Sequence, residues 1–190
     1  MAPARLRSTV AACAAALICG LAAAGCGEQD QGVDEPAREG LAIEIAGVDY
    51  NVFITRELNL AITPDKDYYE GPPAGPGRAL YGIFIEACNP GSKTVRTTGD
   101  FTVRDNQGNE FKPTQLPADN AFAYRPTELA KDACLPEDGS VAQQGPTAGS
   151  MLLFEFPLDN TENRPLELEI GGPFDLLKQD QEVKTVELDL

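Results

Sequence analysis

Apolar and polar residues alternate along several stretches of the chain, which confines much of it to β-strands. In residues 166–170 (LELEI), two leucines and an isoleucine fall on one side and two glutamates on the other. Residues 186–190 (VELDL) repeat this pattern. Because successive side chains of a strand point to opposite faces, each segment would have one buried and one solvated face. Such strands are typical of antiparallel sheets.

Two other segments are apolar on both faces and are predicted to lie at the centre of the core. They are residues 80–88 (LYGIFIEAC) and residues 151–156 (MLLFEF). Exposing either face of such a strand to water is unfavourable, so both faces should be covered. We therefore expect these two segments to contribute most of the buried side chains.

Two hairpins are predicted where turn-forming residues separate short apolar segments. Residues 101–104 and 110–112 flank the sequence DNQGN, and residues 42–45 and 50–57 flank Gly47. Glycine adopts the positive φ values that tight hairpin turns require. These segments are therefore expected to pair as antiparallel strands.

Two long regions between the predicted strands are rich in proline or glycine. Residues 63–78 are predicted to be loop, and residues 113–146 include five prolines. In the second region, helical periodicity is confined to residues 127–133, where Thr127 could cap one turn. Because an irregular segment this long is uncommon in a compact domain, some contact should pin it.

Seven to eight short strands and few helices predict an all-β fold, an antiparallel β-sandwich with long Pro-rich loops over residues 41–190. Three segments stand out: the strand at residues 81–89 that ends in Asn89, the aromatic hairpin at 101–111, and the glycine-containing turn and strand at 146–157. Together they resemble the immunoglobulin-like domain of unknown function of secreted bacterial lipoproteins and small mycobacterial secreted antigens. The resemblance implies an extracytoplasmic sandwich without known catalytic residues.

The N-terminal residues 1–25 have the layout of a secretory signal peptide, with two arginines, an apolar run at 10–24 and small residues before Cys26. The run of about 15 residues is short of the roughly 20 that a transmembrane helix needs. The small residues followed by Cys26 resemble the lipobox of bacterial lipoproteins, although Ala23 stands where leucine is common. That resemblance implies lipid on Cys26 and anchoring at the extracytoplasmic face of the cell membrane. Secretion without lipid is the alternative.

Residues 26–40 are predicted to be the lipid anchor and a flexible tether, because the segment has almost no large apolar side chain. Cleavage before Cys26 would leave 13 basic and 30 acidic residues, a net charge of −17. Lysine and arginine are the residues that bind nucleic acid and anionic headgroups. The acidic excess therefore argues against a nucleic-acid partner and against docking on anionic lipid.

Only two cysteines, Cys88 and Cys134, would remain in the mature domain, since Cys13, Cys19 and Cys26 belong to the signal peptide or the anchor. Cysteines of an exported domain meet an oxidising compartment. We predict a disulfide between Cys88 and Cys134, and two buried thiols are the alternative.

The chain contains no histidine, which removes Ser-His-Asp and Cys-His arrangements and the usual zinc ligand sets. No catalytic residue, metal site or cofactor is predicted, and an enzyme is not expected. A carrier or sensor for calcium or a small ligand is one alternative, using residues 105–110 (DNQGNE) or the cluster Asp65, Asp67 and Glu70. Turn formation and a solvated loop are the simpler explanations of these residues. A carboxylate-dependent envelope hydrolase is a weaker alternative, because no acidic pair stands out.

The leading hypothesis is a membrane-anchored module that recognises an envelope protein or peptide through loops or an edge strand. Four aromatic residues in the irregular regions are the candidate binding surface: Tyr68, Tyr69, Phe122 and Tyr124. Tyrosine gives a large contact area at low entropic cost, and loops of sandwiches commonly carry recognition. The simpler explanation is that these rings cover the ends of the core.

Overall fold

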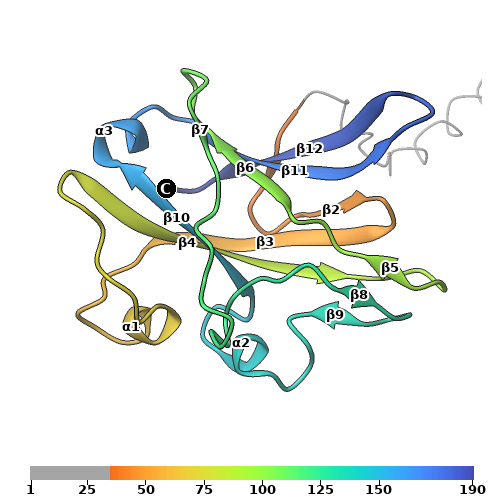
Figure 1. Ribbon diagram of the computed structural model, residues 1–190, viewed down its shortest axis with the longest axis horizontal. Coiled ribbons are helices and arrows are strands. Elements are labelled where there is room, and N and C mark those ends of the chain that lie inside the picture. The colour runs from red at the N-terminus through yellow and green to blue at the C-terminus, as the bar shows by residue number, and fades with distance from the viewer. Residues whose placement is uncertain (1–34) are drawn as a thin grey trace, which may run out of the picture. The chain divides into compact units, whose positions relative to one another are not determined.

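A computed structural model describes residues 35–190, so the predicted signal peptide and Cys26 lie outside the described residues (Figure 1). Seven strands in the described part have four or more residues: β2 (Ala42–Ile45), β3 (Val48–Glu57), β4 (Arg78–Cys88), β6 (Asp100–Arg104), β10 (Ser150–Pro157), β11 (Leu166–Asp175) and β12 (Asp180–Leu188). Five strands have two residues: β1 (Ala37–Arg38), β5 (Val95–Arg96), β7 (Glu110–Phe111), β8 (Glu128–Leu129) and β9 (Cys134–Leu135). The helices have four residues each: α1 (Asp65–Tyr68), α2 (Val141–Gln144) and α3 (Leu158–Thr161).

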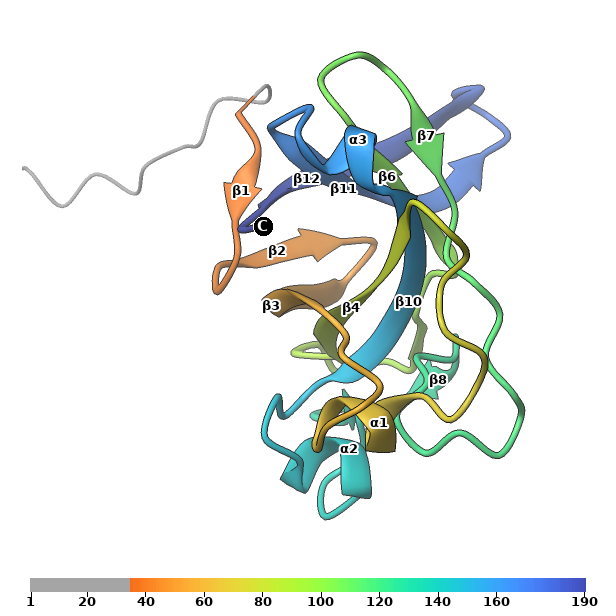
Figure 2. The same ribbon diagram turned by 90° about the vertical axis from the view of Figure 1, so that its left-hand side faces the viewer.

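The strands form two main sheets and a small ribbon. Sheet I has the order β1-β12-β11-β6-β7, and sheet II has the order β10-β4-β3-β2, with β9 also paired to β4. β5 and β8 make the ribbon. The pairing of β1 with β12 is parallel, and the other strand pairs are antiparallel. Figure 2 shows the two sheets stacked face to face, which confirms the predicted all-β sandwich.

The main core fills the space between the two sheets. Odd-numbered residues of β4, such as Ile83 and Ile85, are fully buried against sheet I. From the other side, Leu166, Leu168 and Ile170 of β11 enter the same core, as their alternation predicts. The predicted hairpins are confirmed as well, by the pairing of β2 with β3 and of β6 with β7.

A second core covers the outer face of sheet II and explains why two strands are apolar on both faces. The even-numbered residues Leu80 and Phe84 of β4 point into it, together with Met151 of β10. Its cover consists of residues 58–77 and 113–124, which we call the loop layer. In Figure 2, α1 lies on the side of sheet II that faces away from sheet I.

Part of the loop layer also closes the outer edge of β10. The backbone N–H of Thr114 donates to the carbonyl of Leu153 at 2.6 Å. Farther along, the N–H of Tyr124 donates to the carbonyl of Met151 at 2.9 Å. This edge is therefore occupied and cannot pair with an added strand.

Cys88 and Cys134 form the predicted disulfide, with an S–S distance of 2.06 Å. The bond joins the end of β4 to β9 and so attaches the second proline-rich region to a central strand. The neighbouring Asn89 is buried, and its Nδ2 donates to the carbonyls of Leu129 at 3.0 Å and Ala130 at 2.9 Å. A covalent bond and an amide side chain together hold this region in place.

The helical turn predicted at residues 127–133 is wrong. Glu128 and Leu129 form β8 and pair with β5. The carbonyl of Thr127 accepts a hydrogen bond from the backbone N–H of Thr97 at 2.9 Å instead of starting a helix. A single helical turn gains little by itself, so pairing with a neighbouring strand decides the local structure.

The predicted start of the domain at residue 41 is also too late. Ala37 and Arg38 form β1 beside β12, and Ala37 is 4% exposed. The carboxylate of Glu39 accepts backbone hydrogen bonds from Thr55 and Asp189, both at 3.2 Å. Backbone pairing orders this segment although it has little apolar surface. No helix within residues 35–190 is long and apolar enough to span a membrane.

Candidate functional site

The aromatic residues predicted as a binding surface are packed inward. Tyr68 is 1% exposed, and its ring centroid lies 4.8 Å from that of Phe84 and 4.9 Å from that of Phe122. Tyr69 and Phe122 are partly buried against the same second core. These rings do not form an exposed binding surface. They cover the outer face of sheet II, as the simpler explanation expected, because they gain more from burial than from exposure.

Tyr124 is buried in the main core, in the same cluster as Phe101 but not in that of Tyr68. Its ring centroid lies 5.0 Å from that of Phe101, and its hydroxyl donates to the carbonyl of Thr98 at 2.9 Å. Burial, with a smaller effect of the nearby Tyr50, raises the pKa of Tyr124. The residue therefore links the loop layer to sheet I and has no exposed face to offer a partner.

The loop between β6 and β7 is organised around Asp105, which is 3% exposed. Its carboxylate accepts hydrogen bonds from the backbone N–H groups of Gln107 and Asn109 and from the side-chain amides of Asn109, Asn160 and Asn163, at 2.8 to 3.0 Å. Burial alone would raise the pKa of Asp105, but the asparagine hydrogen bonds hold it well below its usual range. Five N–H groups occupy this carboxylate, so the loop is a structural turn and not an open set of calcium ligands.

In the second acidic cluster, Asp65, Asp67 and Glu70, one residue is buried and two are exposed. Asp65 is 2% exposed and forms an ion pair with Arg56 at 2.8 Å. It also accepts the backbone N–H of Asn59 at 2.9 Å, which fixes the start of the loop layer. Asp67 and Glu70 are exposed. Asp65 is therefore a structural residue, contrary to the expectation of a solvated loop.

Glu86 lies beside the disulfide, with a carboxylate oxygen within 4.8 Å of the sulfurs of Cys88 and Cys134. Both sulfurs are engaged in the S–S bond, so neither can act as a thiolate ligand. Burial raises the pKa of Glu86, and the nearby Asp138 adds to the effect. The group is a half-buried carboxyl beside a covalent link and offers no metal site in this state.

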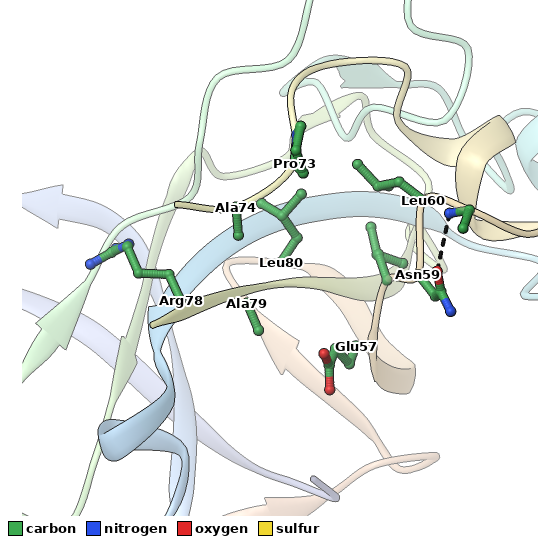
Figure 3. A pocket seen from close by; sticks show the side chains of 10 residues that line it. Glu57, Asn59, Leu60, Pro73, Ala74, Arg78, Ala79 and Leu80 are labelled. Atoms are coloured by element: carbon green, nitrogen blue, oxygen red, sulfur yellow. Dashed lines mark hydrogen bonds between the residues drawn. The ribbon is translucent and has the colours of Figure 1, made fainter. Parts of the chain in front are cut away.

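A pocket of about 400 Å³ lies where the loop layer meets the end of sheet II (Figure 3). The chain leaving β3 forms one wall and the segment leading into β4 forms the other. Most of its lining is apolar or small: Leu58, Leu60, Ala61, Pro73, Ala74, Ala79 and Leu80. The buried Leu58 and Leu80 belong to the second core, so that core forms the floor.

Three polar residues complete the lining of the pocket. Arg78 points away from it in Figure 3, and its Nε donates to the carboxylate of Glu155 at 2.6 Å. The side-chain oxygen of Asn59 accepts the backbone N–H of Ala61 at 3.0 Å. Glu57 is opposite Tyr81 in the strand register, so its side chain lies on the inner face of sheet II, and in Figure 3 its carboxylate is on the other side of β4 from Leu80. The arrangement suits an apolar group.

A further exposed feature, the β11–β12 hairpin, was not predicted as a site. Phe174, Leu176, Leu177 and Val183 are 57%, 81%, 97% and 50% exposed. Only residues 186–190 of the second strand were expected from the alternation. The run PFDLL at residues 173–177, which puts three large apolar residues at an expected turn between two strands, is the signal that could have revealed it.

The structure of this chain is similar to the solved structures of several bacterial proteins. The yjhA protein of Bacillus subtilis matches with a TM-score of 0.47 and 10% identity over 80% of this chain and 99% of that chain. An uncharacterized β-sandwich protein of Clostridium difficile 630 gives 0.44 and 12%, over 82% and 97%. A predicted lipoprotein of Bacillus subtilis, ycdA, gives 0.45 and 11%, over 78% of this chain and 38% of that chain. No protein-family model matches the chain, and no curated protein matches it.

Proposed function

We propose that the protein is an exported lipoprotein whose β-sandwich recognises an envelope protein or peptide. The proposed anchor is Cys26, with the protein held on the extracytoplasmic face of the membrane. The support is the order of charged, apolar and small residues before Cys26 and a disulfide within the domain. The immunoglobulin-like character of the sandwich belongs to the same proposal.

The pocket between the loop layer and sheet II is the observation on which the recognition proposal rests. Its volume of about 400 Å³ falls within the range of ligand sites, and its floor is part of a packed core. An apolar side chain of a partner would fit into it.

The two other hypotheses find less support in this geometry. Asp105 already accepts five protein hydrogen bonds and Asp65 is paired with Arg56, so neither acidic loop presents a free group of oxygen ligands. Hydrolysis by paired carboxylates requires two acidic side chains flanking a substrate, whereas the pocket lining has Glu57 alone.

Site-specific photo-crosslinking in intact cells tests the proposal. A photoreactive amino acid at Pro73, on the exposed lip of the pocket, is compared with one at Val141, an exposed residue of α2 that is not part of the lining. We expect a discrete cross-linked protein or peptide from position 73 and none from position 141. Identical patterns, or none at either position, would contradict recognition through the pocket.

A variant that fills the pocket provides a second test of the same proposal. Ala74→Trp places an indole in the lining, and Val141→Trp adds the same side chain elsewhere. We expect Ala74→Trp to abolish the cross-link from position 73 while the melting temperature stays close to that of Val141→Trp. A cross-link that survives in Ala74→Trp would place the partner outside the pocket.

A further inference from the structure

The outer part of the β11–β12 hairpin exposes apolar side chains that the sandwich does not cover. Of the nine large hydrophobic residues that are exposed within residues 35–190, four lie between Phe174 and Val183. Leu177, at 97% exposure, makes almost no contact with the rest of the domain. Exposed leucines and phenylalanines concentrated at one tip mark a contact surface.

The hairpin leaves the sandwich at a defined point. Gly171 and Gly172 are buried, whereas Pro173 and Phe174 are exposed. A Cβ atom at Gly172 would lie 2.9 Å from Cγ2 of Ile45, so a glycine is needed where β11 passes β2. The register with β12 shifts between Gly171 and Phe174, as in a β-bulge. The outer hairpin is thus redirected away from the core by the backbone itself.

The direction of β1 relates this hairpin to the proposed anchor. β1 runs parallel to β12, with Ala37 opposite Val186 and Arg38 opposite Glu187. The start of β1 therefore faces the same side as the start of β12, which is where the hairpin turn lies. The chain enters the domain from the side of Leu176 and Leu177.

The distances are compatible with a tip at the membrane surface. Cys26 precedes Ala37 by eleven residues, which span at most about 40 Å when extended and about 20 Å as a flexible coil. Val186 is six residues from the start of β12 at Asp180, or roughly 20 Å in a strand, and Leu177 lies in the turn just beyond that point. A domain held by lipid on Cys26 therefore keeps Leu177 within reach of the bilayer.

We infer that Leu176 and Leu177, with Phe174 beside them, insert into the interfacial layer of the membrane that carries the anchor. This inference rests on the proposed lipidation of Cys26. Asp175, Lys178 and Asp180 surround the tip, so the contact is apolar and does not depend on anionic headgroups. The anchor supplies a high local concentration, which makes a small apolar contact effective.

The consequence is a fixed orientation of the domain. Figure 1 shows the β11–β12 turn at one end of the view and the loop at residues 58–77 toward the other. That loop carries Leu60 and Pro73 of the pocket. With the tip in the bilayer, the pocket faces away from the membrane and stays open to a partner in the envelope.

A tryptophan reporter tests the insertion, because the chain contains no tryptophan. Leu177→Trp is compared with Leu158→Trp, a residue of α3 that is 47% exposed and lies outside the hairpin. Each full-length protein is purified from the membranes of its own cells and reconstituted into phosphatidylcholine vesicles with plain or brominated acyl chains. We expect Leu177→Trp emission to shift to the blue and to lose most of its intensity to brominated lipid, and Leu158→Trp emission to remain unchanged.

The remaining outcomes separate the insertion from the anchor. Vesicle-bound protein in which Leu177→Trp emits like Leu158→Trp would overturn the insertion and leave the anchor intact. A blue shift in native membranes but not in vesicles would assign the tip to a protein partner, which also overturns it. Protein that neither floats with vesicles nor carries acyl mass would instead contradict the proposed anchor.

Discussion

The loop layer and the β11–β12 hairpin reverse the usual relation between regularity and burial. The loop layer is rich in proline and glycine and has one four-residue helix, yet it buries Tyr68 and Leu116 against sheet II. The hairpin is regular antiparallel structure, yet it exposes Phe174, Leu176 and Leu177. Burial in this protein follows from what lies opposite a segment and not from whether the segment is a strand or a loop.

The difference has a direct structural cause. β4 and β10 of sheet II are apolar on both faces, so a second layer is required to cover Leu80 and Phe84. The two irregular regions supply this layer. The outer hairpin has no second sheet opposite it, since its strands leave the core beyond Gly172. One region is therefore structural, and the other is available for contact with something else.

The largest effect is expected from replacing a ring in the loop layer. Tyr68→Ala removes a side chain that is 1% exposed and packs on Phe84 and Phe122, which should lower the free energy of unfolding by about 3–5 kcal/mol. Leu177→Ala in the hairpin should change it by less than about 0.5 kcal/mol. Urea titrations of both variants check the pair. Equal effects would show that the two regions do not differ as described.

The next largest effect is expected from the disulfide. Replacing Cys88 and Cys134 by alanine opens a loop of 46 residues and should cost about 2–4 kcal/mol. Hydrogen exchange should quicken at β9 and the nearby Asn89 and should not change at the hairpin turn. Quicker exchange at Leu176 and Leu177 would mean that the hairpin is coupled to the loop region.

The positions of the main strands could largely be predicted from the sequence. Period-two patterns located β11, and apolar runs located β4 and β10, because these signals depend on local alternation. Two strands without a polar face indicated that both faces of this part of the sheet would be covered. What covers such strands depends on contacts distant in sequence, so the sequence could not decide whether Tyr68 and Tyr124 are exposed for binding or cover the core.

The pocket could not be predicted from local sequence patterns. The pocket is lined by two segments that are separated in sequence, one at Leu58 and one at Ala79, and it forms only when they pack together. The predicted helical turn failed at Glu128 for the same reason, since its partner strand β5 is about thirty residues away. Cys88 and Cys134 were paired correctly because only two cysteines remain after Cys26.

A smaller effect is expected at Asp105, which ties the β6–β7 loop to the segment after α3. Asp105→Asn should cost roughly 1–3 kcal/mol near neutral pH by leaving amide donors without a carboxylate. The folded pKa lies below the unfolded value of about 3.9, so this stabilisation is present above that pH and is lost as pH falls through the folded pKa. Denaturation measured from pH 7 to pH 3 should show the gap between wild type and variant beginning to narrow at the acidic end. A constant gap would mean that the Asp105 charge is not stabilising.

The smallest change in stability is expected at the hairpin tip. The double variant Leu176→Ser, Leu177→Ser removes two exposed apolar side chains and should leave the melting temperature within about 1–2 °C of wild type. Its cross-linking pattern from position 73 should change in intact membranes, because the domain would no longer be held in one orientation. The variant Val141→Ser, on α2, serves as the matched control. A large fall in melting temperature would show that the tip is packed in the folded protein.

Intact mass spectrometry of the protein from its native membrane, before and after reduction and alkylation of thiols, tests the exported and anchored state most directly. We predict a chain that begins at Cys26 with added acyl mass, and two thiols, those of Cys88 and Cys134, that alkylate only after reduction. A mass that retains residues 1–25, or a mature chain without acyl mass, would contradict the anchor and with it the orientation of the hairpin toward the membrane.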